Sequence, residues 1–221
     1  MNINEFQKFV LDQKSTPPER YDNEYFNKDW RSGGNNYAIK TRRLIEGKNP
    51  LLIKEVFKPK KVLDLGCGPG ALMLFLNEIG VECEGVDGSP HVIEMAPPEV
   101  REKISVAVAT ECGKPSESYD LVISREVMEH LTVLEVRRAV SEMCRVSSQF
   151  VYLTTRYHPN PATILDVTTD FETDPTHITC MSKDLMRMLF VLEGFCSRPD
   201  LEEKMDWQQK GRVMVFEKRK K

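Results

Sequence analysis

Short apolar segments alternate with amphipathic segments along most of the chain after residue 60. The apolar segments have the length and side-chain content of strands, and we predict strands at residues 61–65, 82–86, 104–109, 119–124 and 150–155, after Gly194-Phe195, and at 212–218. Helical spacing of apolar residues predicts helices at residues 71–79, 135–146 and 182–193, and one from Ser89-Pro90 to the Pro97-Pro98 pair. This alternation is typical of an α/β protein with a doubly wound parallel sheet.

The N-terminal part of the chain has a different pattern. Residues 21–37 are aromatic and contain Trp30 and a Gly33-Gly34 pair, so they fit either a lid over a site or a helix and loop that cover the sheet edge. Residues 38–57 have helical spacing with a break at Pro50. Several lysines and arginines make this second stretch basic, and such a run is more often a solvated helix face than a binding patch.

One segment combines an apolar strand, an acid and three alternating glycines: Val62-Leu63-Asp64-Leu65-Gly66-Cys67-Gly68-Pro69-Gly70. It reads as a strand, a tight turn and the start of a helix. A turn of glycines lets a ligand lie against the backbone because no Cβ stands in the way. The helix behind the turn offers unpaired N–H groups at its N-terminus. The same residues also match the dinucleotide fingerprint, so the turn alone allows two kinds of cofactor.

Three further features favour a cationic, adenosine-containing cofactor. Asp64 ends the first strand beside the turn, where a carboxylate would repel a pyrophosphate but suits an amine. Asp87 ends the second strand, where an acid can accept both hydroxyl groups of a ribose. The fourth strand leads into an E-x-x-E-H segment, residues 126–130, which is not part of the dinucleotide pattern.

With these motifs, residues 60–218 closely resemble the class I S-adenosylmethionine-dependent methyltransferases. The resemblance implies a Rossmann-like, seven-stranded, mostly parallel sheet with the last strand antiparallel and helices on both faces. It implies one S-adenosylmethionine-binding globular domain over residues 58–221, preceded by a helical and lid segment, residues 1–57.

The resemblance also implies the cofactor contacts. Asp64, Gly66, Gly68 and Gly70 would face the methionine end of the cofactor, Asp87 with Gly88 the ribose, and Ser124 and Arg125, mostly through their backbone, the sulfonium. Members of the family often have an Asp after the third strand that binds the adenine amino group. This chain has Ala109-Thr110-Glu111-Cys112 there, and we expect Thr110 or Glu111 to take that place.

Glu126, Glu129 and His130 stand at positions i, i+3 and i+4, and would share one face if this stretch is helical. Together with His177 they resemble the segment of ubiquinone-pathway O-methyltransferases and small-RNA 2′-O-methyltransferases whose acids and histidines bind a divalent metal. The resemblance implies a metal held by these four residues, which would lower the pKa of an acceptor hydroxyl. Two alternatives remain open. His130 or His177, with Glu126, can act as a metal-free general base, or the same residues serve only packing.

Composition narrows the choice of acceptor. The 221 residues carry a net charge of −3, which gives no global signal for nucleic acid or a membrane. The six cysteines form no C-x-x-C pair, and the N-terminus has no signal-peptide pattern, so we expect reduced thiols and a cytoplasmic protein. We therefore predict methyl transfer to a hydroxyl or amine of a small molecule. An RNA or tRNA methyltransferase, supported by the basic residues 40–61 and 218–221, and a catalytically silent interaction module are the alternatives. A dehydrogenase is more distant, and the sequence leaves the oligomeric state open.

Overall fold

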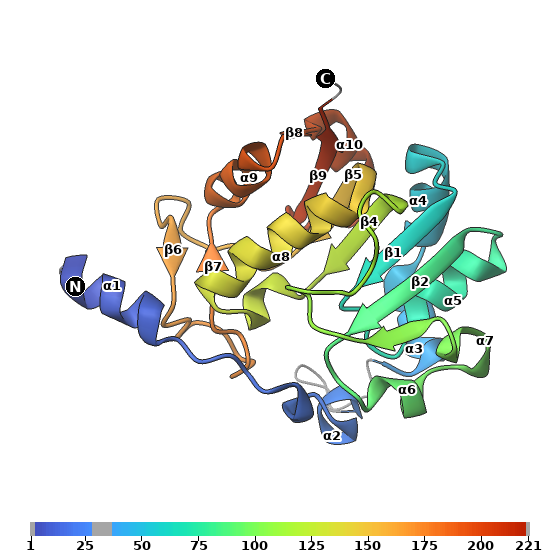
Figure 1. The fold of residues 1–221 in the computed structure, drawn as a ribbon, viewed down its shortest axis with the longest axis horizontal. Helices are drawn as coiled ribbons and strands as arrows, with labels where there is room; N and C mark the ends of the chain where they lie inside the picture. Colours follow the sequence, from blue (N-terminus) through green and yellow to red (C-terminus); the bar gives the residue numbers. More distant parts are fainter. Residues whose placement is uncertain (1–2, 28–36, 220–221) are drawn as a thin grey trace.

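The computed structural model describes residues 3–27 and 37–219, and its centre is one seven-stranded sheet (Figure 1). The strand order is β3-β2-β1-β4-β5-β9-β8. The strands are β1 (Lys61–Leu65), β2 (Glu82–Asp87), β3 (Ile104–Val106), β4 (Tyr119–Arg125), β5 (Ser147–Thr154), β8 (Phe195–Ser197) and β9 (Val213–Lys218). All pairings are parallel except those of β9, which runs antiparallel to both β5 and β8. The predicted fold class is confirmed.

Helices cover both faces of the sheet and bury alternate strand residues. On one face α4 (Asn49–Phe57), α5 (Ala71–Glu78), α6 (Val92–Met95), α7 (Pro98–Arg101) and α10 (Pro199–Met205) pack on a cluster that includes Val62. On the other face α8 (Val133–Val146) and α9 (Lys183–Leu192) pack on a cluster that includes Leu63 and Leu65. Because neighbouring residues of a strand point to opposite faces, Asp64 projects to the α4 and α5 side of β1.

Some predicted boundaries differ from the structure. The third strand ends at Val106, because residues 107–111 turn back and form a bridge between Val108 and Glu111. Ser89 is not the N-cap of a helix: α6 begins at Val92, and the Ser89 hydroxyl instead donates to the Tyr21 carbonyl. Helix α10 and the short β6–β7 pair (Leu165–Asp166 and Cys180–Met181) were not predicted.

The N-terminal residues form short helices that lead to the sheet. They are α1 (Ile3–Asp12), η1 (Pro18–Arg20), α2 (Asn23–Asn27), α3 (Ile39–Glu46) and α4. Pro50 does not break a long helix, because Gly47 ends α3 and Pro50 lies in the first turn of α4, where its missing N–H costs nothing. Trp30 and the Gly33-Gly34 pair lie outside the described residues. Within the described residues, every helix is too short or too polar to span a bilayer.

Candidate functional site

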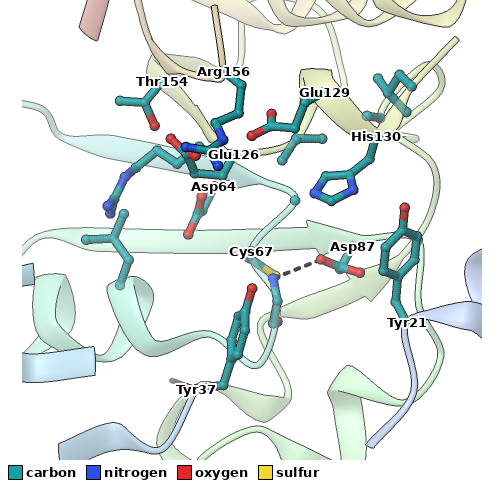
Figure 2. A pocket seen from close by; sticks show the side chains of 18 of the residues that line it. Tyr21, Tyr37, Asp64, Cys67, Asp87, Glu126, Glu129, His130, Thr154 and Arg156 are labelled. Carbon is teal, nitrogen blue, oxygen red and sulfur yellow. Dashed lines mark hydrogen bonds between the residues drawn. The ribbon is translucent and has the colours of Figure 1, made fainter. Parts of the chain in front are cut away.

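A cavity of about 730 Å³ opens at the C-terminal ends of the central strands. The glycine turn and the ends of β2, β4 and β5 line it, together with the N-terminal segments and Thr173, Asp174 and His177. Figure 2 shows Asp64, Asp87, Glu129 and His130 around a common space that Tyr21 and Tyr37 approach from the N-terminal segments. In doubly wound folds, ligands bind at this end of the sheet.

The glycine turn adopts a backbone that other residues would disturb. Gly66 has a φ of 83°, and a Cβ built on it would lie 2.2 Å from Cγ2 of Val127. Gly68 has a φ of 52° and lines the cavity. Gly70, with a φ of 80°, is the N-cap of α5 and is not among the residues that line the cavity. The first two glycines therefore keep the cavity wall at backbone level, whereas the third serves the start of the helix.

The Asp87 carboxylate holds the turn in place. Its Oδ2 accepts the N–H of Gly68 at 2.8 Å, and its Oδ1 accepts the N–H of Ser89 at 2.9 Å. Burial raises the pKa of Asp87, although these two hydrogen bonds work in the opposite direction. Gly88 lines the cavity beside it. Asp87, the residue predicted to bind the ribose, thus also stabilises the glycine turn.

Asp64 is a buried carboxyl group at the cavity wall, with 4% of its surface exposed. Burial raises its pKa to about 7, a shift that the charge of Arg125 opposes and the charge of Glu46 supports. A cation placed in the cavity next to Asp64 would remove this penalty and favour the ionised form.

A network of charged residues from the N-terminal helix α3 adjoins Asp64. Glu46 is 1% exposed, and its oxygens bind Nη2 of Arg42 at 2.6 Å and Nη1 of Arg125 at 2.5 Å. Burial acts against ionisation of Glu46, but the charges of Arg125 and Arg42 outweigh it, so the pKa of Glu46 is lowered. No pattern in the sequence indicates a role for Glu46, and Arg42 belongs to the basic stretch that we interpreted as a solvated helix face. Both line the cavity.

The other predicted cofactor contacts differ in their placement. Thr110 lines the cavity beside the end of β3, whereas the side chain of Glu111 is exposed and does not line it. Arg125 lines the cavity, but Ser124 is fully buried in β4, and its Oγ has no hydrogen-bond partner. Of the two adenine candidates, the geometry favours Thr110.

The E-x-x-E-H segment is not a helix, so its acids do not share a helical face. Glu126 follows the end of β4 with a φ of 54°, and only Met128–His130 form one 3-10 turn, η2. Glu126 is 42% exposed, and its carboxylate binds Nη1 of Arg212 at 3.2 Å. Glu129 is 1% exposed; its Oε2 accepts the hydroxyl of Thr155 at 2.7 Å, and its Oε1 has no hydrogen-bond partner. Burial, with the charge of Glu126, raises the pKa of Glu129.

The structure brings His130 and His177 together from distant parts of the chain, with their ring centroids 4.7 Å apart. Nδ1 of His130 lies 2.9 Å from Oγ1 of Thr176, and Nδ1 of His177 lies 3.0 Å from Oε2 of Glu172. Burial, and next the charge of His177, lower the pKa of His130 to about 4, so its ring is neutral near pH 7. One ligand atom from each of Glu129, His130 and His177 falls within 4.8 Å of the others. Glu126 is not in this group.

Two sets of cavity residues had only weak signals in the sequence. Tyr21, Tyr25 and Tyr37 belong to the aromatic stretch that we interpreted as a lid or cover, and they line the cavity. Asp174, which lines the cavity, and Thr176, which contacts His130, belong to the long loop of residues 156–181, which by its length is expected to form part of the pocket wall.

Comparison with known proteins places the chain in a family. A family model described as a methyltransferase domain matches residues 37–195. The chain belongs to this methyltransferase family. The resemblance to S-adenosylmethionine-dependent methyltransferases is therefore confirmed at the level of family and fold.

Individual relatives match over shorter segments. Norajmaline N-methyltransferase of Rauvolfia serpentina is 31% identical over 99 residues, which are 41% of this chain and 33% of the relative. A probable chloroplastic tocopherol O-methyltransferase of Oryza sativa subsp. japonica is 37% identical over 99 residues, 41% of this chain and 27% of the relative. The matches thus span about a third of these relatives.

Among solved structures, a magnesium protoporphyrin IX methyltransferase of Synechocystis PCC 6803 with bound S-adenosylmethionine has a TM-score of 0.60 and 16% identity. The match covers 94% of this chain and 100% of that one. At this identity the likeness shows the fold.

Proposed function

We propose that the protein transfers a methyl group from S-adenosyl-L-methionine to a hydroxyl or amine of a small-molecule acceptor. The observation that carries this proposal is the pair of carboxylates that flank the glycine turn, Asp64 buried and Asp87 partly buried. Burial raises the pKa of Asp64, so that a cation beside it would be favoured, and Asp87 ends β2, where the ribose of an adenosine cofactor is proposed to lie. A cofactor with a sulfonium and an ammonium and no phosphate suits this wall.

The residues fit such a cofactor from end to end. In this proposal the methionine end lies on Gly66 and Gly68, which line the cavity, with its ammonium at Asp64. Asp87 accepts the ribose hydroxyls, and Thr110 lies at the adenine end. The cofactor would supply the electrophilic methyl group, and the protein's task would be to place an acceptor atom in line with it.

The acceptor would enter on the side of His130 and His177. A neutral imidazole in a buried site can accept the proton that a hydroxyl or amine loses on methylation. The relatives include both an N- and an O-methyltransferase, and both acceptor atoms fit this chemistry.

The basic stretch gives little support to an RNA acceptor. Arg43 pairs with Glu78, Lys61 pairs with Glu84, and Nζ of Lys54 donates to the carbonyl of Ile79. These cations are satisfied within the protein. RNA binding through them would have to break each pair, and it would show a steep loss of affinity with salt.

The test is calorimetric titration with S-adenosylmethionine or S-adenosylhomocysteine. We expect Asp87→Ala to weaken binding about 10–100-fold, because it removes the ribose acceptor and frees the turn. Asp120→Ala is the matched control: Asp120 also accepts two backbone N–H groups, those of Lys60 and Lys61, at the opposite end of the sheet. If the unaltered protein binds neither ligand, the proposed activity is wrong and a silent interaction module becomes the better hypothesis.

A divalent metal at Glu129, His130 and His177 is a second candidate, favoured by the way their ligand atoms converge. One carboxylate and two imidazoles suit Zn²⁺, Mn²⁺ or Fe²⁺ better than Mg²⁺. The unpartnered Oε1 of Glu129 is what a missing cation would leave. A bound metal would lower the pKa of an acceptor hydroxyl. Glu126, the fourth ligand implied by resemblance, would have to leave Arg212 to join the site.

The metal hypothesis has its own test. Metal analysis of the purified protein should find about one equivalent, and EDTA should lower its melting temperature, because binding stabilises the folded state. His177→Ala should abolish both effects, whereas His91→Ala, which alters a residue outside the group, should not. If His177→Ala keeps the metal content of the unaltered protein and the same response of its melting temperature to EDTA, this metal site is contradicted.

A further inference from the structure

The loop before His177 carries three polar side chains at alternate positions, Glu172, Asp174 and Thr176. Asp174 and Thr176 are 7% and 4% exposed and have no role in the proposed function so far. Asp174 lines the cavity, and Thr176 touches His130. Their hydrogen bonds determine which nitrogen of His130 is available.

Asp174 acts only as an acceptor. Its Oδ1 receives the backbone N–H of Thr176 at 2.9 Å and the hydroxyl of Thr176 at 2.7 Å. Its Oδ2 receives the hydroxyl of Tyr25 at 3.3 Å. A carboxylate that accepts three donors has no proton of its own to give. The proton in the short contact between the two oxygens of Asp174 and Thr176 must therefore come from the threonine.

The direction of the hydrogen bond between Thr176 and His130 follows from that of the bond between Thr176 and Asp174. A threonine hydroxyl has one proton, and that of Thr176 is directed to Asp174. Oγ1 of Thr176 can then only accept from Nδ1 of His130, which lies 2.9 Å away. Nδ1 of His130 must carry the ring proton. The neutral ring then has its lone pair on Nε2, the remaining polar atom of a side chain that faces the cavity (Figure 2).

We propose that Thr176 and Asp174 are positioning residues of the methyl-transfer site, which hold His130 as its Nδ1–H tautomer and so present Nε2 to the acceptor. The role in catalysis rests on the proposed function. During methyl transfer the acceptor oxygen or nitrogen would form a bond to the methyl carbon as the S–CH₃ bond breaks and neutral S-adenosylhomocysteine leaves, and Nε2 of His130 would take the proton that the acceptor O–H or N–H loses. The His130–Thr176–Asp174 chain then places a carboxylate behind the imidazolium.

The second histidine has the same arrangement. Nδ1 of His177 donates to Oε2 of Glu172 at 3.0 Å, an oxygen that also accepts Nη2 of Arg156 at 3.0 Å. Nε2 of His177 is 3.8 Å from Oδ2 of Asp174, too far for a hydrogen bond. Both rings thus use Nδ1 for the loop and leave Nε2 for the site.

The test is a two-bond ¹H–¹⁵N correlation spectrum of the full-length ¹⁵N-labelled protein at pH 7.5, after treatment with a chelator. The chain has four histidines, and the His130 signals are assigned by their loss in His130→Gln. We expect an excess of the Nδ1–H tautomer of at least about tenfold, since the other tautomer would leave Nδ1 and the threonine oxygen with facing lone pairs. If His130 of the unaltered protein is mainly the Nε2–H tautomer, the proposal is wrong, irrespective of the results for any variant.

Two variants separate positioning from packing. Thr176→Val keeps the shape of the side chain but removes the hydroxyl, and the excess of the Nδ1–H form should fall to about threefold or less. Thr176→Ser is the matched control, because it restores the hydroxyl and should restore the tautomer. In turnover, Thr176→Val should lower kcat about tenfold and leave the dissociation constant of S-adenosylmethionine within about twofold.

The outcomes distinguish this inference from the proposed function. The tautomer is measured without cofactor or acceptor, so failure to bind S-adenosylmethionine would count against the function and leave the hydrogen-bond assignment standing. Conversely, if Thr176→Val folds and keeps the Nδ1–H form as fully as Thr176→Ser, the two residues do not position His130, even in an active methyltransferase.

Discussion

The two halves of the cavity are built in different ways. Most of the proposed cofactor half comes from one continuous stretch, from β1 through the glycine turn to Asp87, whose key contacts involve backbone groups, while Thr110 and Arg125 join it from later in the chain. The acceptor half joins side chains from segments far apart in sequence, such as His130 and Thr176, which are 46 residues apart. The first half is thus a property of a local backbone conformation, and the second is a property of how loops pack.

The two halves also differ in how well their buried polar groups are satisfied within the protein. The proposed cofactor half holds a buried carboxyl group, Asp64, whose burial raises its pKa to about 7, and a turn whose positive φ angles suit glycine but not other residues. In the acceptor half, hydrogen bonds satisfy Asp174, Thr176 and one oxygen of Glu129. Changes in the cofactor half should therefore act mainly through backbone and charge, and changes in the acceptor half through individual side chains.

The largest effect is expected at the glycine turn. Gly66→Ala should destabilise the protein by about 3–5 kcal/mol, because the new Cβ meets Val127 and the backbone is left-handed. Gly80→Ala is the control: Gly80 has a φ of 76° but open space around it, so only the backbone cost of about 1–2 kcal/mol remains. Urea unfolding measures both. Equal losses would mean that the close approach to Val127 is not what requires glycine.

A large effect of opposite sign is expected at Asp64. Its pKa is about 7 in the folded protein and about 3.9 in an unfolded chain. The folded state therefore binds this proton more tightly, so the Asp64 contribution lowers stability as the pH rises from 4 to 7. Asp64→Asn should remove that loss and raise the free energy of unfolding at pH 7.5 by about 2–4 kcal/mol. At pH 4 the two proteins should be nearly equal; a variant less stable at both pH values would contradict the assignment.

The same group predicts a smaller effect on binding. A protonated Asp64 cannot pair with the ammonium of S-adenosylmethionine, so the affinity should fall below pH 7, by at most about tenfold per pH unit. Calorimetry between pH 5.5 and 7.5 would show this slope. Asp64→Asn should bind weakly with a shallower slope, because the titration of Asp64 is removed. An unchanged slope would remove Asp64 from the ammonium site.

The smallest effect is expected in the acceptor half. The side chain of Gln13 donates to the carbonyl of Ile178 at 2.7 Å and accepts the N–H of Val133 at 2.9 Å, so it ties the N-terminal segment to this half. Gln13→Ala should cost about 1–2 kcal/mol. It should speed hydrogen exchange of residues 13–21 and raise the KM of the acceptor more than the dissociation constant of the cofactor. If Gln13→Ala instead raises the dissociation constant of the cofactor more than the KM of the acceptor, the two halves of the cavity are not independent.

Much of the fold could be predicted because its signals are local. The seven strands and the glycine turn follow from apolar periodicity and from residues adjacent in sequence, and β1 begins and ends at the predicted residues. The third strand was predicted too long, because residues 107–109 are apolar but turn back at the cavity edge. The E-x-x-E-H segment does not form the helix that its i, i+3 and i+4 spacing allows, because Glu126 has a positive φ at the end of β4, which the spacing does not reveal.

The sequence alone indicated the elements of the proposed cofactor wall: a strand that ends at Leu65, a turn of alternating glycines, and Asp87 at the end of the next strand. These features depend on residues close in sequence, and parallel strands bring such ends to one edge. Only the tertiary structure decided that Glu46 lies beside Arg125, and that Asp174 and Thr176 stand behind His130. Those contacts depend on helix packing and loop paths between distant residues, and no local pattern in the chain encodes them.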